Sequence, residues 1–562
     1  MKYQIIAILL LCVLLIFVVL PVGHSLDVVN VHFTQVVGAV AVASLALLLW
    51  RRKVFSCSAI DVVMLLWFVY VAVRAYLQPI YPTASFFLQA LTMLSLYFAL
   101  RLLFSAVRFD ERFIVIALVL CGLYEAGLGI WQFILGYSRH GLFPMTGSFL
   151  NPGPYSLILS IAIVLCIRLK RGWWVALFLG FVLVVTWSRA AMIAAAVCIG
   201  IAYWQRWRRW RWWVLSGFLL VLVALYFVKH GSADGRSIIY IVSSLCIARE
   251  PIFGAGIGSF CHSYAEEFSR FSIEWPYFNF QSADVVTNAF NILLQIGVEQ
   301  GLVGVAFAIA IIILMFRRLR RIAPKLSLAL LCMLIFSLFS YPFEFLPYQL
   351  IFIMIAAYAA TSQTDYIEEY NPKITQRYVA PFLLAFCAFF TLMFTHNQID
   401  RRVKAETEYL KIAGRHYVGF IDDYYDLLPM MRGNADFLFS FGKILALVGR
   451  YNDSNAMLRD GTLVSSDPMF YVVMGNNYRA MGYLHKAEAS YRKAFSIMPN
   501  RIYPLYQLMM FYDEEGDIER AKLMARRVLD FNEKVTSRAT KEMKHKAKTL
   551  LESPENANCV KK

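Results

Sequence analysis

Long runs of apolar residues, separated by short polar segments, fill roughly the first 400 residues of the chain. An α-helix needs about 20 such residues to cross the hydrocarbon core of a bilayer, so the pattern predicts about thirteen membrane-spanning helices. They are expected at residues 4–23, 33–50, 59–77, 84–104, 112–136, 154–168, 172–187, 190–205, 213–228, 301–316, 326–343, 346–361 and 379–396. The expected fold is an all-α polytopic membrane protein whose first run is retained as a helix rather than removed as a signal peptide.

Basic residues gather in alternate connections between these runs, at 51–53, 101–112, 168–171, 206–211 and 317–325. Short connections rich in Lys and Arg stay on the cytoplasmic side of a membrane. We therefore expect a cytoplasmic N-terminus. The intervening connections and everything after about residue 396 are expected on the other side, which in a bacterial inner membrane is the periplasm.

The composition agrees with a bilayer environment, since 59% of the 562 residues are hydrophobic. The net charge of +17 could indicate a nucleic-acid partner. Because the basic residues cluster beside apolar runs, membrane topology accounts for them, and no nucleic acid is expected. Most cysteines lie inside apolar runs, where they act as small hydrophobes. Cys246 and Cys261 fall in a polar segment, where a disulfide and two free thiols both remain open.

The longest break in the apolar series is a mostly polar segment at residues 229–300. Connections of this length are uncommon and usually functional, so this segment is interpreted as a working site held by the membrane helices. It contains the glycine-rich stretch GAGIGSF at 254–260. No strand precedes these glycines, so they predict a tight turn rather than a nucleotide-binding loop.

The sequence changes character after residue 396, where charged residues become frequent and helical periodicity replaces the long apolar runs. Residues 468–501 carry small and aromatic residues at the spacing of a tetratricopeptide repeat, with weaker units on either side. The predicted domains are therefore a transmembrane domain at 1–396 and a periplasmic tetratricopeptide-like helical domain at 397–562. Such arrays bind protein partners or steady an oligomer.

Four stretches in this membrane context resemble one family. They are GSFLNPGPYS at 147–156, TWSRAAMIA at 186–194, PIFGAGIGSF at 251–260 and FNILLQIGVEQGLVG at 290–304. Their order resembles that in the O-antigen ligase and polymerase superfamily, which includes bacterial protein O-oligosaccharyltransferases. The resemblance covers roughly residues 85 to 345.

The resemblance implies transfer of a glycan from an undecaprenyl-diphosphate carrier to an acceptor at the periplasmic face, with neither nucleotide sugar nor metal. It implies that Arg189 and Arg236 hold the diphosphate and that Asn291 belongs to the closing motif of the site. The family carries a histidine, thought to help the acceptor hydroxyl attack, where this chain has Phe290. A phenyl ring cannot take a proton, so that role is not available to residue 290.

The side chains near the polar segment suggest chemistry of their own. Arginine suits a diphosphate because its planar fork meets two phosphate oxygens and stays protonated. A proton acceptor is sought at His262, since histidine titrates near neutral pH, and at Asp284, just before the closing motif. Contacts with phosphate or sugar are expected from Asn151, Arg139, His140, Trp275 and Tyr277. No residue is expected to bind a metal or a cofactor.

Several functions remain open at this point. The first is an O-antigen ligase-like, inverting and metal-independent glycosyltransferase. A polysaccharide polymerase or a protein O-oligosaccharyltransferase is the alternative, with a lipid, a glycan or a protein as acceptor. A non-catalytic membrane scaffold for envelope glycan assembly is suggested by Phe290. A transporter is disfavoured, because no series of charges or paired internal repeat is seen within the membrane segment.

Overall fold

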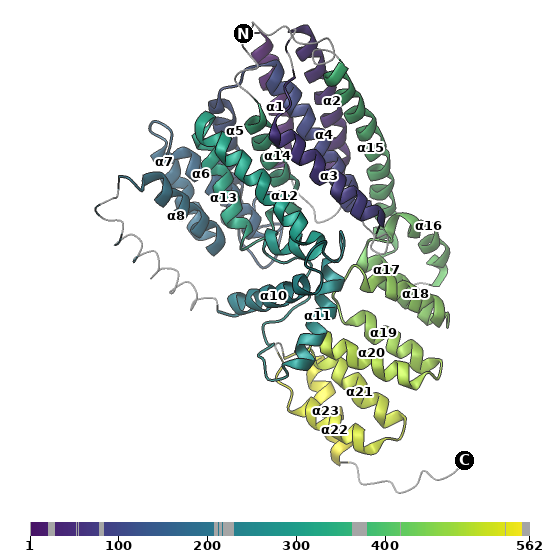
Figure 1. Ribbon diagram of the computed structural model, residues 1–562. Helices are drawn as coiled ribbons and strands as arrows, with labels where there is room; N and C mark the ends of the chain where they lie inside the picture. Colours follow the sequence, from purple (N-terminus) through teal and green to yellow (C-terminus); the bar gives the residue numbers. More distant parts are fainter. Residues whose placement is uncertain are drawn as a thin grey trace.

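The structure is a computed structural model of the whole chain. It describes residues 2–20, 28–51, 53, 55–77, 84–206, 209, 212, 216, 230–361, 379–415, 418–533 and 536–552. Within these residues the chain forms α-helices, short 3-10 helices and connections, without strands (Figure 1). The predicted all-α class is therefore confirmed.

Twelve of the predicted spans coincide with described apolar helices. Their bounds are α1 Lys2–Val19, α2 Val28–Trp50, α3 Ala59–Leu77, α4 Ala84–Ala106, α5 Glu111–Leu135, α6 Pro152–Cys166, α7 Trp173–Val185, α8 Arg189–Tyr203, α12 Ile292–Ile322, α13 Pro324–Ser337, α14 Leu346–Ala360 and α15 Ala380–Ile412. Seven of them are long and apolar enough to cross a membrane, and α6, α7, α8, α13 and α14 are shorter. The predicted span at 213–228 lies outside the described residues, except for Ser216.

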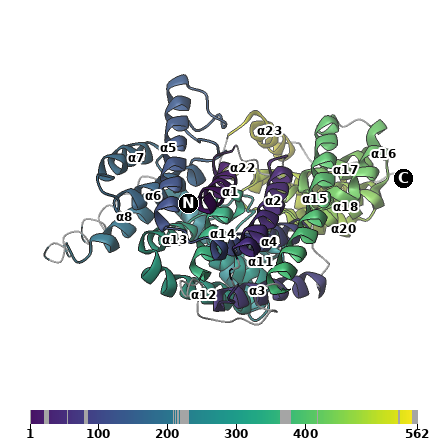
Figure 2. The same cartoon turned by 90° about the horizontal axis from the view of Figure 1, so that it is seen from above.

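The apolar helices pack in two groups that share one core. Helices α1, α2, α4, α14 and α15 lie together, and α5, α6, α7, α8 and α13 form the second group. Helices α3 and α12 pack against each other, and α12 also contacts α13 and α14. Figure 2 shows α7 and α8 at one end of the molecule and the C-terminal helices α16 (Ile421–Met431), α17 (Ala435–Leu447) and α18 (Tyr451–Thr462) at the other.

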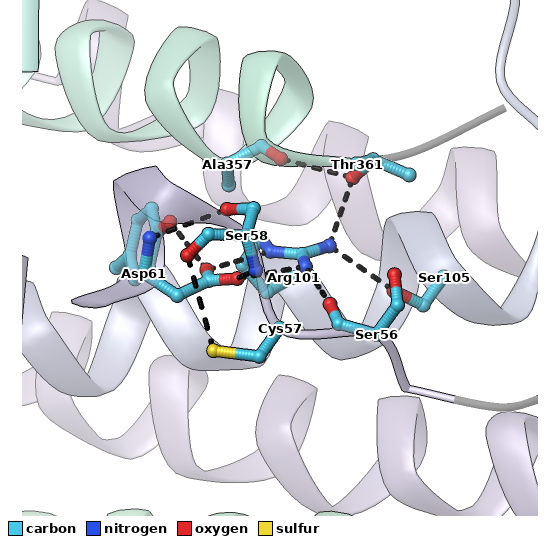
Figure 3. Close-up of polar contacts among 9 residues, drawn as sticks. Ser56, Cys57, Ser58, Asp61, Arg101, Ser105, Ala357 and Thr361 are labelled. Carbon is cyan, nitrogen blue, oxygen red and sulfur yellow. Dashed lines mark hydrogen bonds and ion pairs between the residues drawn. The ribbon is translucent and has the colours of Figure 1, made fainter. Parts of the chain in front are cut away.

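A buried ion pair fastens α3 to α4 (Figure 3). The Asp61 carboxylate accepts hydrogen bonds from Arg101 Nε at 2.9 Å and from the Tyr97 hydroxyl at 2.6 Å. Arg101 also donates to the Ser56 carbonyl at 2.8 Å and to Thr361 Oγ1 at 3.2 Å. Both charged groups therefore have several partners, which a buried charge requires.

The large polar segment is mostly helical. It contains α10 (His230–Arg249) and α11 (Phe260–Glu274), which lie between the membrane helices and the C-terminal part (Figure 1). The next helix, α12, begins at Ile292, earlier than the residue 301 that the apolar run predicts. The cause is the Asn291 side chain, which caps the helix by accepting from the N–H of Leu293 at 3.0 Å and of Leu294 at 3.3 Å.

The C-terminal residues form helices that pack in successive pairs. Their bounds are η4 Val418–Phe420, α16 Ile421–Met431, α17 Ala435–Leu447, α18 Tyr451–Thr462, α19 Met469–Ala480, α20 Leu484–Ile497, α21 Ile502–Glu514, α22 Ile518–Leu529 and α23 Arg538–Glu552. Small residues allow the close approach, since a Cβ on Gly475 would lie 2.5 Å from the Tyr491 ring. The assignment of these pairs to the tetratricopeptide class stays a prediction.

Helix α15 joins the membrane helices to these pairs without a break. It packs on α2 and α4 at one end and on α16 at the other, so the predicted boundary at 396/397 falls within a single helix. Arg402 donates to Ser85 Oγ at 2.6 Å, which holds the middle of α15 against the start of α4. The division into two domains stays a prediction.

Candidate functional site

Arg189 and Arg236 come from distant parts of the sequence and lie close enough to repel each other. Arg189 is the first residue of α8, and Arg236 lies in α10. Both side chains are half-buried. Burial lowers the pKa of Arg236, and the positive charge of Arg189 lowers it further. Two neighbouring guanidinium groups with restricted access to water form a site that an anion would stabilise.

Phe290 lies at the centre of this site. The Arg236 guanidinium carbon is 5.5 Å from the centre of its ring, within the range of a cation–π interaction. The Tyr341 ring meets the Phe290 ring edge-on, with 5.1 Å between centroids. The Tyr240 hydroxyl donates to the Leu338 carbonyl at 2.8 Å, which ties α10 to the end of α13. Position 290, where the resemblance leads us to expect a histidine, therefore holds a phenyl ring that packs against Tyr341 and Arg236.

The connection before α6 brings Asn151 to the same place. Asn151 caps α6 by accepting from Gly153 N–H at 2.8 Å, and its Nδ2 donates to the Tyr341 hydroxyl at 3.3 Å. Two buried side chains of α5 hold this connection in place. Gln132 Oε1 accepts from Gly147 N–H at 2.8 Å, and Glu125 Oε1 accepts from Ser148 Oγ at 2.6 Å. The predicted contact residue Asn151 thus lies beside Tyr341, which sequence reasoning missed.

Two cavities meet at Phe290. The Arg236 cavity has a volume of about 500 Å³ and is lined by Gly231, Gly235, Arg236, Ile239, Tyr264, Ser282, Ala283, Asp284, Val285, Val286 and Phe290. The Glu344 cavity, of about 350 Å³, lies on the other side, and its lining is mainly apolar. The polar residues in that lining are Asn288, Asn291, Gln295, Glu299, Gln300, Ser340, Tyr341 and Glu344. Phe290 is common to both linings, so it lies between the cavity that contains Arg236 and Asp284 and the one that contains Glu299 and Glu344.

The glycine-rich turn and the closing motif pack directly on each other. Helix α12 is kinked at Gly301, whose φ is 65°. The freed N–H groups of Leu302 and Val303 donate to the carbonyls of Pro251 at 2.8 Å and Ile252 at 3.2 Å. A Cβ on Gly301 would lie 2.3 Å from the Ile252 carbonyl oxygen. The predicted tight turn is present, and the two residues Pro251 and Ile252 just before it accept the hydrogen bonds that the kinked helix does not make internally.

The proposed proton acceptors of the polar segment face the C-terminal helices. His262 Nδ1 lies 3.1 Å from the Thr462 carbonyl oxygen. Asp284 lines the Arg236 cavity, but its exposed carboxylate is also 3.9 Å from Arg501 Nη2. The structure brings Asp284, and not His262, to the wall of a cavity. The catalytic role of either residue stays a prediction.

The remaining predicted contact residues lie away from the two cavities. Trp275 and Tyr277 follow α11 and are exposed. Arg139 donates to the Ser148 carbonyl, and the His140 ring packs on Phe143 at 5.1 Å between centroids. None of these four lines the Arg236 or the Glu344 cavity.

The cysteines and acidic residues near the site show whether it holds a disulfide or a group of metal ligands. Cys246 and Cys261 are free thiols, which decides between the two states that the sequence left open. Among the described residues, no three His, Cys, Asp or Glu side chains are grouped so as to hold a metal ion.

The C-terminal helices bind the chain just before Phe290. Val286 N–H donates to Ser466 Oγ at 2.9 Å, and Ser466 Oγ donates to the Val286 carbonyl at 2.8 Å. Asn500 Nδ2 donates to the Ala283 carbonyl at 2.8 Å. One wall of the Arg236 cavity is therefore held by residues of the C-terminal part.

Comparison with known proteins supports the resemblance seen in the motifs. A family model described as O-antigen ligase matches residues 174–309. The matched segment contains Arg189, Arg236, Phe290 and the kinked start of α12. A search of curated proteins found no match to the chain.

Proposed function

We propose, from the match of residues 174–309 to the O-antigen ligase family model, that this chain transfers a glycan from an undecaprenyl-diphosphate carrier to an acceptor hydroxyl. The observation that carries this proposal is the position of Arg236 in the wall of a cavity of about 500 Å³, near enough to Arg189 for that second positive charge to lower its pKa. In the reaction proposed here, the acceptor oxygen attacks the anomeric carbon from the face opposite the diphosphate, which leaves with inversion.

The two arginines are proposed to bind the diphosphate and to stabilise it as it leaves. Negative charge grows on the diphosphate oxygens as the bond to the sugar breaks. Fixed guanidinium groups that are already in place interact more strongly with that developing charge than with the ground state. Arginine keeps its proton even where burial lowers its pKa, so both groups remain cationic. By the topology expected from the sequence, the reaction takes place at the periplasmic face of the bacterial inner membrane.

Protein acceptors are the second possibility within this proposal. Connections between the C-terminal helices contact residues 283 and 286 in the wall of the Arg236 cavity. A protein bound to those helices would be close to the transfer site, which favours protein O-glycosylation over simple lipid ligation. The acceptor class is tested by finding which molecule gains glycan in cells that express the chain.

Replacement of Arg236 tests the transfer reaction. Arg236→Ala removes one of the two cations, and transfer is expected to fall about 10²- to 10³-fold, the range seen when one charge-stabilising donor is lost. The assay reconstitutes the purified protein in liposomes with the lipid-linked glycan extracted from the producing cells, and measures transferred glycan. Arg249→Ala is the matched control, because Arg249 lies on the same helix with its side chain exposed and paired to Glu267.

Each outcome of this assay is informative. Loss of transfer in Arg236→Ala with normal transfer in Arg249→Ala supports the proposal. Equal transfer by both variants removes Arg236 from the mechanism. A wild-type protein that transfers no glycan, yet is needed in cells for glycan assembly, identifies a scaffold instead.

A further inference from the structure

The connection between α13 and α14 places a carboxylate in the Glu344 cavity. Glu344 ends the 3-10 helix η1 (Pro342–Glu344), and its exposed side chain lines the cavity. Within the described part of the chain, this carboxylate makes no hydrogen bond or ion pair. Its position therefore leaves both oxygens available to a bound molecule.

The second carboxylate of the cavity is already used by the fold. Glu299 Oε1 accepts from Gln295 Nε2 at 2.9 Å. The Glu299 carboxylate also lies near the backbone of Gly258 and Phe260, at the start of α11. Of the two acidic groups, Glu344 is the one without such a task.

Tyr341 connects Glu344 with the two arginines. The Tyr341 ring packs on Phe290, and Arg236 lies over that same phenyl ring. Burial raises the pKa of Tyr341, the negative charge of Glu344 raises it further, and the positive charge of Arg236 opposes the change. Glu344 and Arg236 are therefore both neighbours of Tyr341. A sugar held at Phe290 would have a cation and a carboxylate on different sides.

We infer that Glu344 is the catalytic base that takes the proton from the acceptor hydroxyl, the role for which residue 290 has no proton acceptor. The inference rests on the proposed function. In the step, the acceptor O–H proton passes to a Glu344 oxygen while the acceptor oxygen forms a bond to the anomeric carbon. The bond from that carbon to the diphosphate oxygen breaks, and undecaprenyl diphosphate leaves with the electron pair at Arg189 and Arg236.

The surroundings of Glu344 suit this role. Burial raises its pKa to about 7, and the negative charge of Glu299 adds to the effect. A general base whose pKa lies near neutral pH is effective, because a large fraction of it is ionised and it is still basic enough to accept a proton. The ionisable groups that face it are Glu299 on α12, Tyr341 on its own connection and Cys261 on α11. Because the carboxylate must be ionised, the transfer rate is expected to rise with pH through about 7.

The test compares Glu344→Gln and Glu344→Asp with the wild type in the liposome assay. Glutamine keeps the size of the side chain but cannot accept the proton, so kcat is expected to fall at least about 100-fold. The KM for lipid-linked glycan and the affinity for undecaprenyl diphosphate alone are expected to change less than about threefold, since the arginines are intact. Aspartate should restore part of the rate together with its rise with pH. Glu250→Gln, an exposed change just after α10, should match the wild type.

Three results would overturn the inference, and they are separable from failure of the proposed function. One is a Glu344→Gln protein with a kcat within threefold of the wild type. Another is a loss of undecaprenyl-diphosphate binding as large as the loss of kcat, which would indicate a role in donor binding. The third is a rise of rate with pH that survives in Glu344→Gln. If Glu344→Gln does not fold, the same decision rests on Glu344→Asp, whose rate must still depend on pH. A wild-type protein without transfer contradicts the proposed function itself.

Discussion

Phe290 has an unfavourable backbone conformation and lies between the two cavities of the site. Its φ is 51°, in the left-handed region that side chains other than glycine seldom adopt. Such a conformation persists only where the surroundings determine it, and here the Arg236 guanidinium, the Tyr341 ring and the Tyr240 hydroxyl all contact this residue. The strained residue lies at the junction of the two cavities, as expected for a residue that shapes a site.

The sequence predicted the arginines of the site but missed its other half. Arg189 stands in the motif at 186–194 and Arg236 shortly before the motif at 251–260, and both lie on helices, α8 and α10. Glu344 and Tyr341 reach Phe290 only because α13 and α14 pack beside α12. The periodicity of the sequence does not show which helices pack together, so the positions of Glu344 and Tyr341 near Phe290 could not be predicted from it.

Asp61 offers a test of a single buried charge. Asp61→Ala leaves the Arg101 guanidinium buried without its ion partner, and the stability of the folded protein is expected to fall by about 3 to 5 kcal/mol. Thermal unfolding in detergent measures the change. The control is Asp400→Ala, which removes the partner of Lys404 at 2.7 Å on the surface of α15 and should leave the unfolding temperature nearly unchanged. A wild-type unfolding temperature for Asp61→Ala would show that the ion pair does not fasten α3 to α4.

At the scale of elements, the kink in α12 joins two motifs that lie far apart in the sequence. Apolar runs predicted where helices lie, because the length of a run is set by the bilayer. They misplaced the start of α12, because its first turns are partly polar and lie beside the Glu344 cavity. Helix ends depend on caps such as Asn291 and on hydrogen bonds from other segments, which hydropathy does not report.

Gly301→Ala tests this joint. The added Cβ would require an unfavourable φ and would meet the Ile252 carbonyl oxygen, so a destabilisation of about 1 to 3 kcal/mol is expected. Gly180→Ala in α7 is the matched control, since nothing lies within 4 Å of its added Cβ. The unfolding temperatures of the two purified variants are compared in the same detergent. Equal temperatures would mean that the kink tolerates a side chain and that the close backbone contact is not required.

At the scale of the whole molecule, the C-terminal part of the chain holds one wall of the Arg236 cavity by hydrogen bonds. The bonds from Ser466 and Asn500 fix residues 283 and 286, a few positions before Phe290. An ion pair of 2.8 Å between Lys493 and Glu266 binds α20 to α11. The sequence predicted the helical character of this part from its periodicity, but Ser466 and Asn500 lie in connections between helices, and the periodicity of the helices does not predict their contacts.

Ser466→Ala tests this coupling. It removes both hydrogen bonds to Val286 and leaves two buried backbone groups unpaired, which costs about 1 to 3 kcal/mol locally. Amide hydrogen exchange of residues 281–290 is expected to speed up and glycan transfer to fall, while the unfolding of the membrane helices stays as in the wild type. Ser465→Ala is the control, because Ser465 Oγ bonds only within its own turn, to Asp467 N–H at 3.1 Å. Unchanged exchange in Ser466→Ala would show that the C-terminal helices do not hold the segment.

The uninterrupted course of α15 sets a mechanical limit on the enzyme proposed here. A flexible linker would let a bound acceptor move over a wide volume. A continuous 33-residue helix that packs on α2 and α4 instead holds the C-terminal helices in a fixed position. An acceptor bound to the C-terminal helices would then reach Arg236 from one direction and at one distance. The choice of glycosylation site would then depend on the distance between the acceptor hydroxyl and the part of the acceptor that binds the C-terminal helices.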